Sequence, residues 1–291
     1  MREAHGYMHV EVWMSESISY IPFYPDPRGN RLERWEVASV GSGHVLRLRG
    51  PIEVVEQVRA VAPEYRGRTY PASTASEWTH ELSSPDPTIR REVRQLLELL
   101  ERVLSLPSLP PVKFTIALVW YKIPVEGLDS HEWPNTEIGD LVNKGKYMYK
   151  TREEQKGGIG RNLAGRICYA ISRHPALNNA EVILDVPGHD RKILSFGPRI
   201  AATVAKYRRM PGLRVTAKSE FRPEAKSLSR GQSAALLEDQ FIVPPEIRGR
   251  SALIVDDVFR SGGSMVAVAR AAHEAGAREI FGICPTRTRR R

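Results

Sequence analysis

Beyond Pro111, the chain alternates between two patterns of apolar residues. Short apolar runs of strand length are followed by stretches in which apolar residues recur every three or four positions, as on one face of a helix. Strands and helices that take turns in this way are typical of an α/β fold with a parallel sheet and helices on both faces. In chain order, the pattern predicts elements at 112–121, 158–172, 180–186, 193–209, 213–216, 251–255, 262–275 and 278–284.

The N-terminal part follows a different pattern. Short β-like pieces at 10–14, 35–40 and 44–48, separated by turns rich in Pro and Gly, predict a small antiparallel element. One helix is expected over 51–61, with an apolar face of Ile52, Val55, Val58 and Ala62. A second helix begins at Pro87 and carries an apolar stripe through Leu104.

Three prolines, Pro107, Pro110 and Pro111, end the second helix, because proline cannot continue a helix and restricts the residue before it. We therefore place a domain boundary there. Residues 1–106 are expected to form a smaller α+β domain of unknown role, and residues 107–291 a larger domain with the parallel sheet.

The composition of the chain indicates what kind of partner it binds and in which compartment it works. The chain has 43 Lys and Arg against 34 Asp and Glu, a formal charge of +9, which favours anionic partners such as polyphosphates or nucleic acid. Cys168 and Cys284 are too few for a disulfide framework or a four-cysteine zinc site, which favours the reducing cytoplasm. With no apolar leader and no long apolar stretch, neither secretion nor a membrane span is expected.

The most informative segment lies near the C-terminus. An apolar strand over 252–255 is followed by Asp256 and Asp257, and then by the turn Ser261-Gly-Gly-Ser264, which opens into a helix. Small residues at a helix N-terminus leave backbone N–H groups free to bind a phosphate. Carboxylates repel phosphate, so the acid pair indicates a ligand that carries hydroxyls beside its phosphate. A ribose 5-phosphate has this layout.

This order of strand, acid pair, turn and helix resembles the signature of type I phosphoribosyltransferases, which have a Rossmann-like core. The resemblance implies that the two carboxylates bind the ribose 2- and 3-hydroxyls of phosphoribosyl pyrophosphate, and that the turn wraps its 5-phosphate. It assigns the ribose 5-phosphate to Asp256, Asp257, Val258, Phe259, Arg260, Ser261, Gly262, Gly263 and Ser264. The chain departs from the signature at Arg260, Ser261 and Ser264, where the family usually has threonine, so the segment supports binding better than turnover.

The strand over 180–186 ends where the family has its pyrophosphate loop. The resemblance assigns the diphosphate to Pro187, Gly188, His189, Arg191 and Lys192. Backbone N–H groups and cations in this loop suit an anionic leaving group. His189 either holds a phosphate or caps the next helix, and Arg191 is either a ligand or a solvated surface charge.

A polar, cationic stretch over 217–232 is too long for an ordinary connection. The resemblance makes it a lid that closes over the substrate and keeps water from the sugar cation. The candidate diphosphate clamps are Lys218, Arg222, Lys226 and Arg230. With the acid pair, Lys218 and Arg222 are the expected catalytic residues.

Several shorter stretches narrow the resemblance to the competence protein F-like family over about residues 112–286. They lie, in order, at 138–147, 186–191, 227–232, 241–243 and 248–257. That family often begins with a cysteine-rich zinc module, which this chain lacks, so a role in DNA uptake does not carry over to it.

The leading hypothesis is a magnesium-dependent phosphoribosyltransferase that acts on a nitrogenous base or a related acceptor. Mg²⁺ would arrive with the diphosphate, which needs few protein carboxylates, so no dedicated metal site is expected. A hood over about 124–156 would hold the acceptor above a core at about 157–286. In the hood, Trp133, Tyr147 and Tyr149 either stack on a base or pack in the hood's own small core.

Two other functions stay open. The first is a non-catalytic sensor of phosphoribosyl pyrophosphate or a nucleotide, which binds nucleic acid or a protein partner through its basic surface and the C-terminal tail 287–291. The second is a nucleotide-consuming effector with an N-terminal partner-binding module. A homodimer is compatible with each of them.

Overall fold

The computed structural model describes residues 31–70, 77–148, 153–188, 195–219 and 240–288. The expected strand at 10–14 lies outside these residues, as do His189, Arg191, Lys192, Arg222 and most of the expected lid. Among the described helices, none is long and apolar enough to span a membrane.

A seven-stranded sheet forms the centre of the molecule, with its main path in the order β5-β6-β13-β11-β7-β8. Its strands are β5 (Leu104–Leu106), β6 (Thr115–Trp120), β7 (Val182–Asp185), β8 (Gly212–Leu213), β11 (Ser251–Val255) and β13 (Glu279–Arg287), and β12 (Val258–Phe259) pairs with the end of β13. All pairs are parallel except β5 with β6. Every residue of β6, β7 and β11 is buried, as expected for strands covered on both faces.

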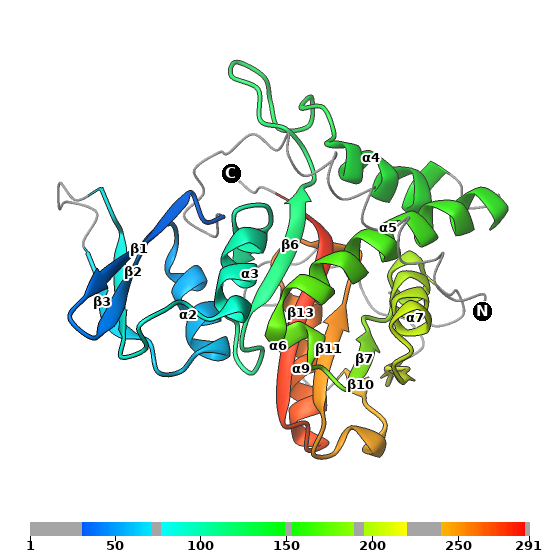
Figure 1. Cartoon of the computed structure of the whole chain (residues 1–291). Helices are drawn as coiled ribbons and strands as arrows, with labels where there is room; N and C mark the ends of the chain where they lie inside the picture. Colours follow the sequence, from blue (N-terminus) through cyan, green and yellow to red (C-terminus); the bar gives the residue numbers. More distant parts are fainter. Residues whose placement is uncertain (1–30, 71–76, 149–152, 189–194, 220–239, 289–291) are drawn as a thin grey trace, which may run out of the picture.

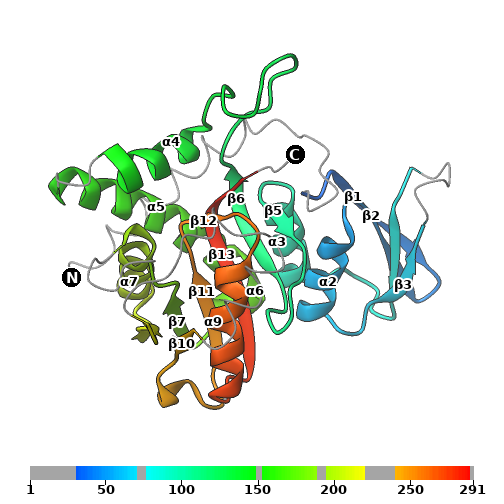
Figure 2. The ribbon, with the colours of Figure 1, turned by 180° about the vertical axis from the view of Figure 1, so that it is seen from behind.

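Helices cover both faces of this sheet, which confirms the α/β class. They are α4 (Glu137–Asn143), α5 (Glu153–Arg173), α6 (Pro175–Asn178), α7 (Phe196–Arg208) and α9 (Gly263–Glu274). In Figure 1, α5 crosses in front of the sheet while α9 lies behind it, and the view from behind in Figure 2 brings α9 to the front. A single hydrophobic core runs from the N-terminal helices through the sheet.

A smaller antiparallel sheet with strand order β1-β2-β4-β3 lies beside the large one, as the turn-rich N-terminal pattern predicts (Figure 1). Its elements are β1 (Arg34–Val40), β2 (Gly43–Arg49), β3 (Arg66–Thr69) and β4 (His80–Ser84), packed with α2 (Ile52–Val61) and α3 (Arg91–Leu100). His44, Leu46 and Leu48 alternate along the buried face of β2. On the other face, Arg47 pairs with Glu36 and Glu81, at 2.8 and 3.0 Å, so charge is compensated there.

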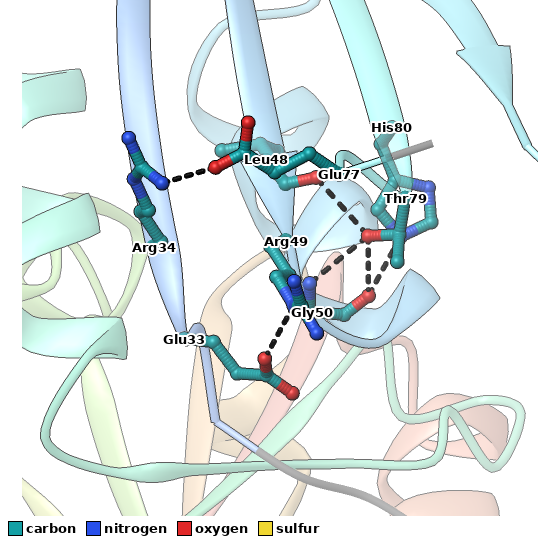
Figure 3. A network of polar contacts seen from close by, with 8 residues as sticks. All are labelled: Glu33, Arg34, Leu48, Arg49, Gly50, Glu77, Thr79 and His80. Atoms are coloured by element: carbon teal, nitrogen blue, oxygen red, sulfur yellow. Dashed lines mark hydrogen bonds and ion pairs between the residues drawn. The ribbon is translucent and has the colours of Figure 1, made fainter. Parts of the chain in front are cut away.

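Figure 3 shows how polar contacts hold the end of β2. The Thr79 hydroxyl accepts a hydrogen bond from Gly50 N at 2.9 Å and lies within hydrogen-bond distance of the Leu48 and Gly50 carbonyls. The ring of His80 also contacts Gly50 O, at 2.9 Å. At the edge of the same sheet, Arg49 pairs with Glu33. These contacts fix the turn that leads into α2.

Both expected N-terminal helices need correction. The second ends at Leu100 rather than Leu104, because Leu104–Leu106 pairs with β6 as an edge strand of the large sheet. In α2, Ile52 is 43% exposed, whereas Gln57 is fully buried against β5, so the buried face is rotated from the expected one. The boundary after residue 106 stays a prediction, although residues 104–106 already belong to the large sheet.

The expected strand at 213–216 is two separate pieces. Gly212–Leu213 extends the large sheet as β8, whereas β9 (Thr216–Ala217) pairs with β10 (Phe241–Ile242) in a two-stranded antiparallel ribbon. The break coincides with Val215, whose N–H donates to the side-chain Oδ1 of Asp185 in β7, at 2.8 Å, instead of to a backbone carbonyl.

Candidate functional site

The acid pair lies at the carboxyl end of β11, where parallel α/β sheets bind their ligands. Because Val255 pairs with Asp185, the acid pair also adjoins the end of β7. Asp257 is 6% exposed and Asp256 is half-buried. The backbone N–H of Asp257 donates to Asp256 Oδ1 at 2.8 Å, which holds the Asp256 carboxylate against the backbone of Asp257.

The turn after the acid pair brings the chain to the N-terminus of α9. Gly262 caps the helix with a φ of +79°. A Cβ at this position would lie 2.5 Å from Leu109 Cδ1 and 2.8 Å from Phe259 Cζ, so both backbone conformation and space require glycine. Among the described residues, no side chain caps α9, so the N–H groups of its first turn, at Gly263 and Ser264, are available to an anion.

The other residues assigned to the ribose 5-phosphate differ in their exposure. Arg260 and Ser261 are exposed at the tip of the turn. Val258 and Phe259 form β12 and pair with Thr286 and Arg287 of β13, and Phe259 is 5% exposed. The turn is thus built on a short strand that extends the large sheet beyond the acid pair.

The structure adds Lys146 to the acid pair, a residue for which the sequence predicts no role. Its Nζ lies 2.9 Å from Asp257 Oδ1. Burial by itself would lower the pKa of Lys146, but the charges of Asp257 and Asp256 and the hydrogen bond to Asp257 outweigh it and raise this pKa. The ammonium therefore stays protonated at neutral pH.

Lys146 reaches the acid pair because the hood is anchored to the large sheet. Thr136 caps α4 by accepting from Gly139 N at 2.9 Å, and its hydroxyl donates to Trp120 O at 2.7 Å, at the end of β6. The helix then continues as a π-helical turn, η1 (Lys144–Met148), which presents Lys146. Single π-helical turns recur at functional sites.

Gly145 fixes the position of this turn. A Cβ there would lie only 2.7 Å from two ring carbons of Phe196, so η1 packs directly on the first residue of α7. The next residue of α7, Gly197, approaches the acid pair, since a Cβ on it would be 3.6 Å from Asp256 Oδ1. The hood, the start of α7 and the acid pair therefore meet at one place.

Tyr121 follows β6 on the hood side of the site, and its hydroxyl donates to Asn143 Oδ1 at 3.3 Å. Burial raises the pKa of Tyr121 to about 12, so the phenol is neutral. Trp133 Nε1 contacts the carbonyls of Val125 and Leu128, at 3.1 and 3.0 Å, which corresponds to packing within the hood. Tyr147 is 48% exposed beside Lys146, and Tyr149 lies outside the described residues.

Two loops expected in the site begin at its edge. Pro187 and Gly188 are half-buried two and three residues after the end of β7, and the described chain resumes at Ser195 before α7, which begins beside the acid pair. Lys218 is exposed directly after β9, and its N–H donates to Gln240 O at 2.8 Å. The β9–β10 pairing thus brings the start of the expected lid next to Phe241 and Ile242, while the end of the expected lid at residue 232 lies outside the described residues.

Asp185, at the end of β7, ties the segment before β9 to the sheet. Its Oδ1 accepts from Val215 N at 2.8 Å, and burial raises the pKa of this carboxyl. Within the described residues, no group of three or more His, Cys, Asp or Glu side chains could hold a metal ion.

The expected basic tail needs a correction at its first residue. Strand β13 continues to Arg287, which is 3% exposed, and its guanidinium lies 5.2 Å from the centroid of the Trp120 ring. Arg287 is therefore part of the fold rather than of a surface tail. Residues 289–291 lie outside the described part of the chain.

No protein-family model matches the chain, and no curated protein is significantly similar to it, so the competence protein F-like resemblance is not confirmed. Solved structures with partial similarity include a purine phosphoribosyltransferase from Pyrococcus horikoshii OT3, with 17% identity over 43% of this chain and 80% of that one and a TM-score of 0.29. An adenine phosphoribosyltransferase shows 16% identity over 45% of this chain and 71% of its own, with a TM-score of 0.32. The AQ2163 protein from Aquifex aeolicus shows 13% identity over 52% of this chain and 83% of its own, with a TM-score of 0.34.

Proposed function

We propose that the protein binds phosphoribosyl pyrophosphate together with magnesium and transfers the phosphoribosyl group to a nitrogenous base or a related acceptor. The observation that carries this proposal is the acid pair at the end of β11, followed within a few residues by the N-terminus of α9. Carboxylates accept hydrogen bonds from vicinal hydroxyls, and the first turn of a helix binds phosphate. A ribose 5-phosphate satisfies both groups at once.

In the reaction, the bond between the anomeric carbon and the diphosphate oxygen breaks, and its electron pair leaves on the diphosphate. A nitrogen of the acceptor forms the new bond to that carbon and gives up a proton. Positive charge develops on the sugar in the transition state, so carboxylates beside the ribose and cations beside the diphosphate both stabilise it. Asp256 and Asp257 supply the first requirement.

The cations are proposed to come from two loops. Arg191 and Lys192, with the backbone at Pro187, Gly188 and His189, would bind the diphosphate. Lys218 and Arg222 would close on it from the lid. Support comes from the described residues beside these segments, because β7 and α7 adjoin the acid pair and the β9–β10 ribbon joins the residues on either side of the stretch that contains the lid.

Asp256 and Asp257 also fit a magnesium ion that is held mainly by the diphosphate. Mg²⁺ keeps several of its waters and takes only one or two protein carboxylates in such sites, and the half-buried Asp256 would accept a hydrogen bond from one of those waters. When bound, the ion neutralises charge on the departing diphosphate. We also propose that the chain is related to the competence protein F-like family. The shorter stretches of sequence that resemble this family support that part of the proposal.

A second candidate, a sensor that binds the same ligand without turnover, is favoured by the turn itself. Arg260 and Ser261 stand exposed where threonines are usual in the signature, so the phosphate contacts can differ from those of an enzyme. Binding of nucleic acid by such a sensor has little support from the small sheet, where Arg47 is paired with two glutamates.

Calorimetry with phosphoribosyl pyrophosphate and magnesium tests the proposal, and the absence of binding heat for this ligand and for nucleoside monophosphates would contradict it. Release of diphosphate in the presence of free bases then separates enzyme from sensor. Replacing residues 221–238 by a short linker keeps the β9–β10 ribbon. For an enzyme with a lid, this variant should retain ground-state binding and lose diphosphate release, whereas a sensor releases none even with the intact loop.

A further inference from the structure

Lys146 is a half-buried cation with a fixed place in the candidate site, and nothing in the proposed function accounts for it. Its ammonium is 2.9 Å from Asp257 Oδ1, and it comes from a π-helical turn far from Asp257 in the sequence. Ligand hydroxyls that occupy the acid pair would have to share or rearrange this ion pair. The place of Lys146 relative to a bound sugar therefore decides what it can do.

Packing places Lys146 on one side of the acid pair. Gly145 rests on the ring of Phe196, and Gly197 comes next to Asp256, so η1 and the start of α7 lie together. The turn that leads into α9 is on the other side, because α9 covers the opposite face of the sheet from α5 (Figures 1 and 2). Lys146 thus faces the end of the site where the segment after β7 returns to α7.

The geometry of a ribose 5-phosphate relates these two sides. Carbons 2 and 3, which carry the hydroxyls, lie between carbon 1 at one end of the ring and the carbon 5 branch at the other. If the hydroxyls are held by the acid pair and the 5-phosphate by the first turn of α9, carbon 1 must point away from α9. It then points toward α7 and Lys146, and any anionic group on carbon 1 enters the reach of the ammonium.

On this basis, which rests on the proposed function, we propose that Lys146 binds the anionic group on carbon 1 of the sugar, the diphosphate in phosphoribosyl pyrophosphate. In the free protein the same ammonium neutralises Asp257. It thereby offsets the repulsion between the acid pair and a diphosphate, which would otherwise weaken binding. Lys146 is then a diphosphate-binding residue contributed by the hood, in addition to the two loops.

A purely structural role for the ion pair predicts a different result. If Lys146 only holds the hood against Asp257, its loss changes the affinity for all sugar phosphates by the same factor. If it contacts the group on carbon 1, the loss is confined to ligands that carry a diphosphate there. Phosphoribosyl pyrophosphate and ribose 5-phosphate differ in just this group, so their affinity ratio separates the two roles.

The test measures both ligands by calorimetry, in the presence of magnesium, on the full chain and on Lys146→Gln, Lys146→Arg and Lys144→Gln. Lys144 is the matched control because it lies in the same π-helical turn but pairs with Asp140, at 2.6 Å. We expect Lys146→Gln to bind phosphoribosyl pyrophosphate about 10- to 100-fold more weakly, as for the loss of a hydrogen bond between charged groups. Ribose 5-phosphate should change by less than about threefold, Lys146→Arg should restore part of the loss, and Lys144→Gln should match the unmodified chain.

Equal changes for the two ligands, or an unchanged affinity for phosphoribosyl pyrophosphate, would overturn this role of Lys146 and leave the proposed function standing. An unmodified chain that binds neither ligand would overturn both. Circular dichroism establishes that each variant is folded. Lys146→Met, which keeps the aliphatic stem of the side chain, replaces Lys146→Gln if that variant does not fold.

Discussion

His174 Nε2 lies 3.2 Å from Gln57 Oε1, and both side chains are fully buried. Gln57 belongs to α2 of the N-terminal part, and its amide also donates to Ser105 Oγ of β5 at 2.9 Å. His174 immediately precedes α6 and stacks on Phe114, with ring centroids 4.8 Å apart. A buried polar network therefore joins the N-terminal helices to the large sheet, and both sides depend on it for their hydrogen bonds.

We expect Gln57→Leu to destabilise the whole chain. The substitution leaves the buried N–H of His174 and the hydroxyl of Ser105 without this partner, which costs about 1–3 kcal/mol for each unsatisfied group. Urea unfolding followed by fluorescence and circular dichroism should show a lower midpoint and one shared transition. Gln95→Leu is the control, since Gln95 contacts Ser172 O from a more exposed position on α3 and should change stability by less than about 0.5 kcal/mol.

The same network predicts a loss of stability in acid. Burial lowers the pKa of His174 to about 3, below its value of about 6.5 in the unfolded chain. Between these values the unfolded state binds more protons, so this contribution is complete above about pH 6.5 and falls as the pH drops toward about 3. Urea midpoints at neutral pH and near pH 5 should differ for the unmodified chain.

His174→Phe keeps the stacking on Phe114 but removes the titrating group. The variant should be less stable at neutral pH, because Gln57 loses a partner, and its midpoint should depend less on pH. Some pH dependence is expected to remain, since burial also lowers the pKa of His80. An identical pH profile in both proteins would exclude His174 as a source of acid lability.

The sequence predicts the parts of the site that are contiguous. Strand β11 has the predicted bounds, and α9 begins within one residue of its predicted start, because an apolar run, two carboxylates and a glycine turn succeed one another directly. Lys146 contacts Asp257 across 111 positions, and no local pattern encodes such a contact. The glycine between Lys144 and Lys146 was the available signal, since it marks a close approach that only packing on Phe196 explains.

The errors in the N-terminal part arise from the same limit. Leu104 continues the apolar period of α3, so the local pattern favours a helix, but the edge of β6 offers backbone partners that override it. Gln57 is polar and is not on the predicted apolar face of its helix, but its amide satisfies Ser105 and His174 within the core. In both cases a tertiary contact decides against the local preference.

Replacing either member of the acid pair should weaken binding of phosphoribosyl pyrophosphate, with different effects on the fold. Asp256→Asn and Asp257→Asn are each expected to cost about 1–3 kcal/mol of binding free energy through lost charge-assisted hydrogen bonds. Only Asp257→Asn also removes the ion-pair partner of Lys146, so it should lower the thermal midpoint more than Asp256→Asn does. Asp140→Asn, which affects the pair with Lys144, is the control for charge alone. Undiminished affinity in both acid-pair variants would give the carboxylates another role.

Gly145→Ala should separate the hood from α7. The added methyl would overlap the Phe196 ring, so either η1 or the first turn of α7 must move, and we expect a loss of about 1–3 kcal/mol of stability together with weaker ligand binding. Gly160→Ala is a sensitive control, because its methyl would meet the same ring at 4.0 Å, an ordinary contact, from within α5. Alanine favours a helix over glycine by up to about 1 kcal/mol, so the control should be neutral or stabilising. Equal behaviour of the two variants in thermal unfolding would show that Phe196 adapts freely.

The basic C-terminus can now be divided into a structural residue and a tail. Arg287 packs on Trp120 at the end of β13, so Arg287→Ala should lower stability by about 1–2 kcal/mol through lost packing and cation–π contact. Removing residues 289–291 should leave the unfolding midpoint unchanged. If these three arginines contact phosphates, their removal should also reduce the salt dependence of DNA binding by up to about three units in the slope of log affinity against log salt. The deletion must leave Arg287 in place, because its loss would disturb the sheet and mix a change in stability with the change in DNA binding. A slope that is unaffected by the truncation would mean that the tail makes no phosphate contacts.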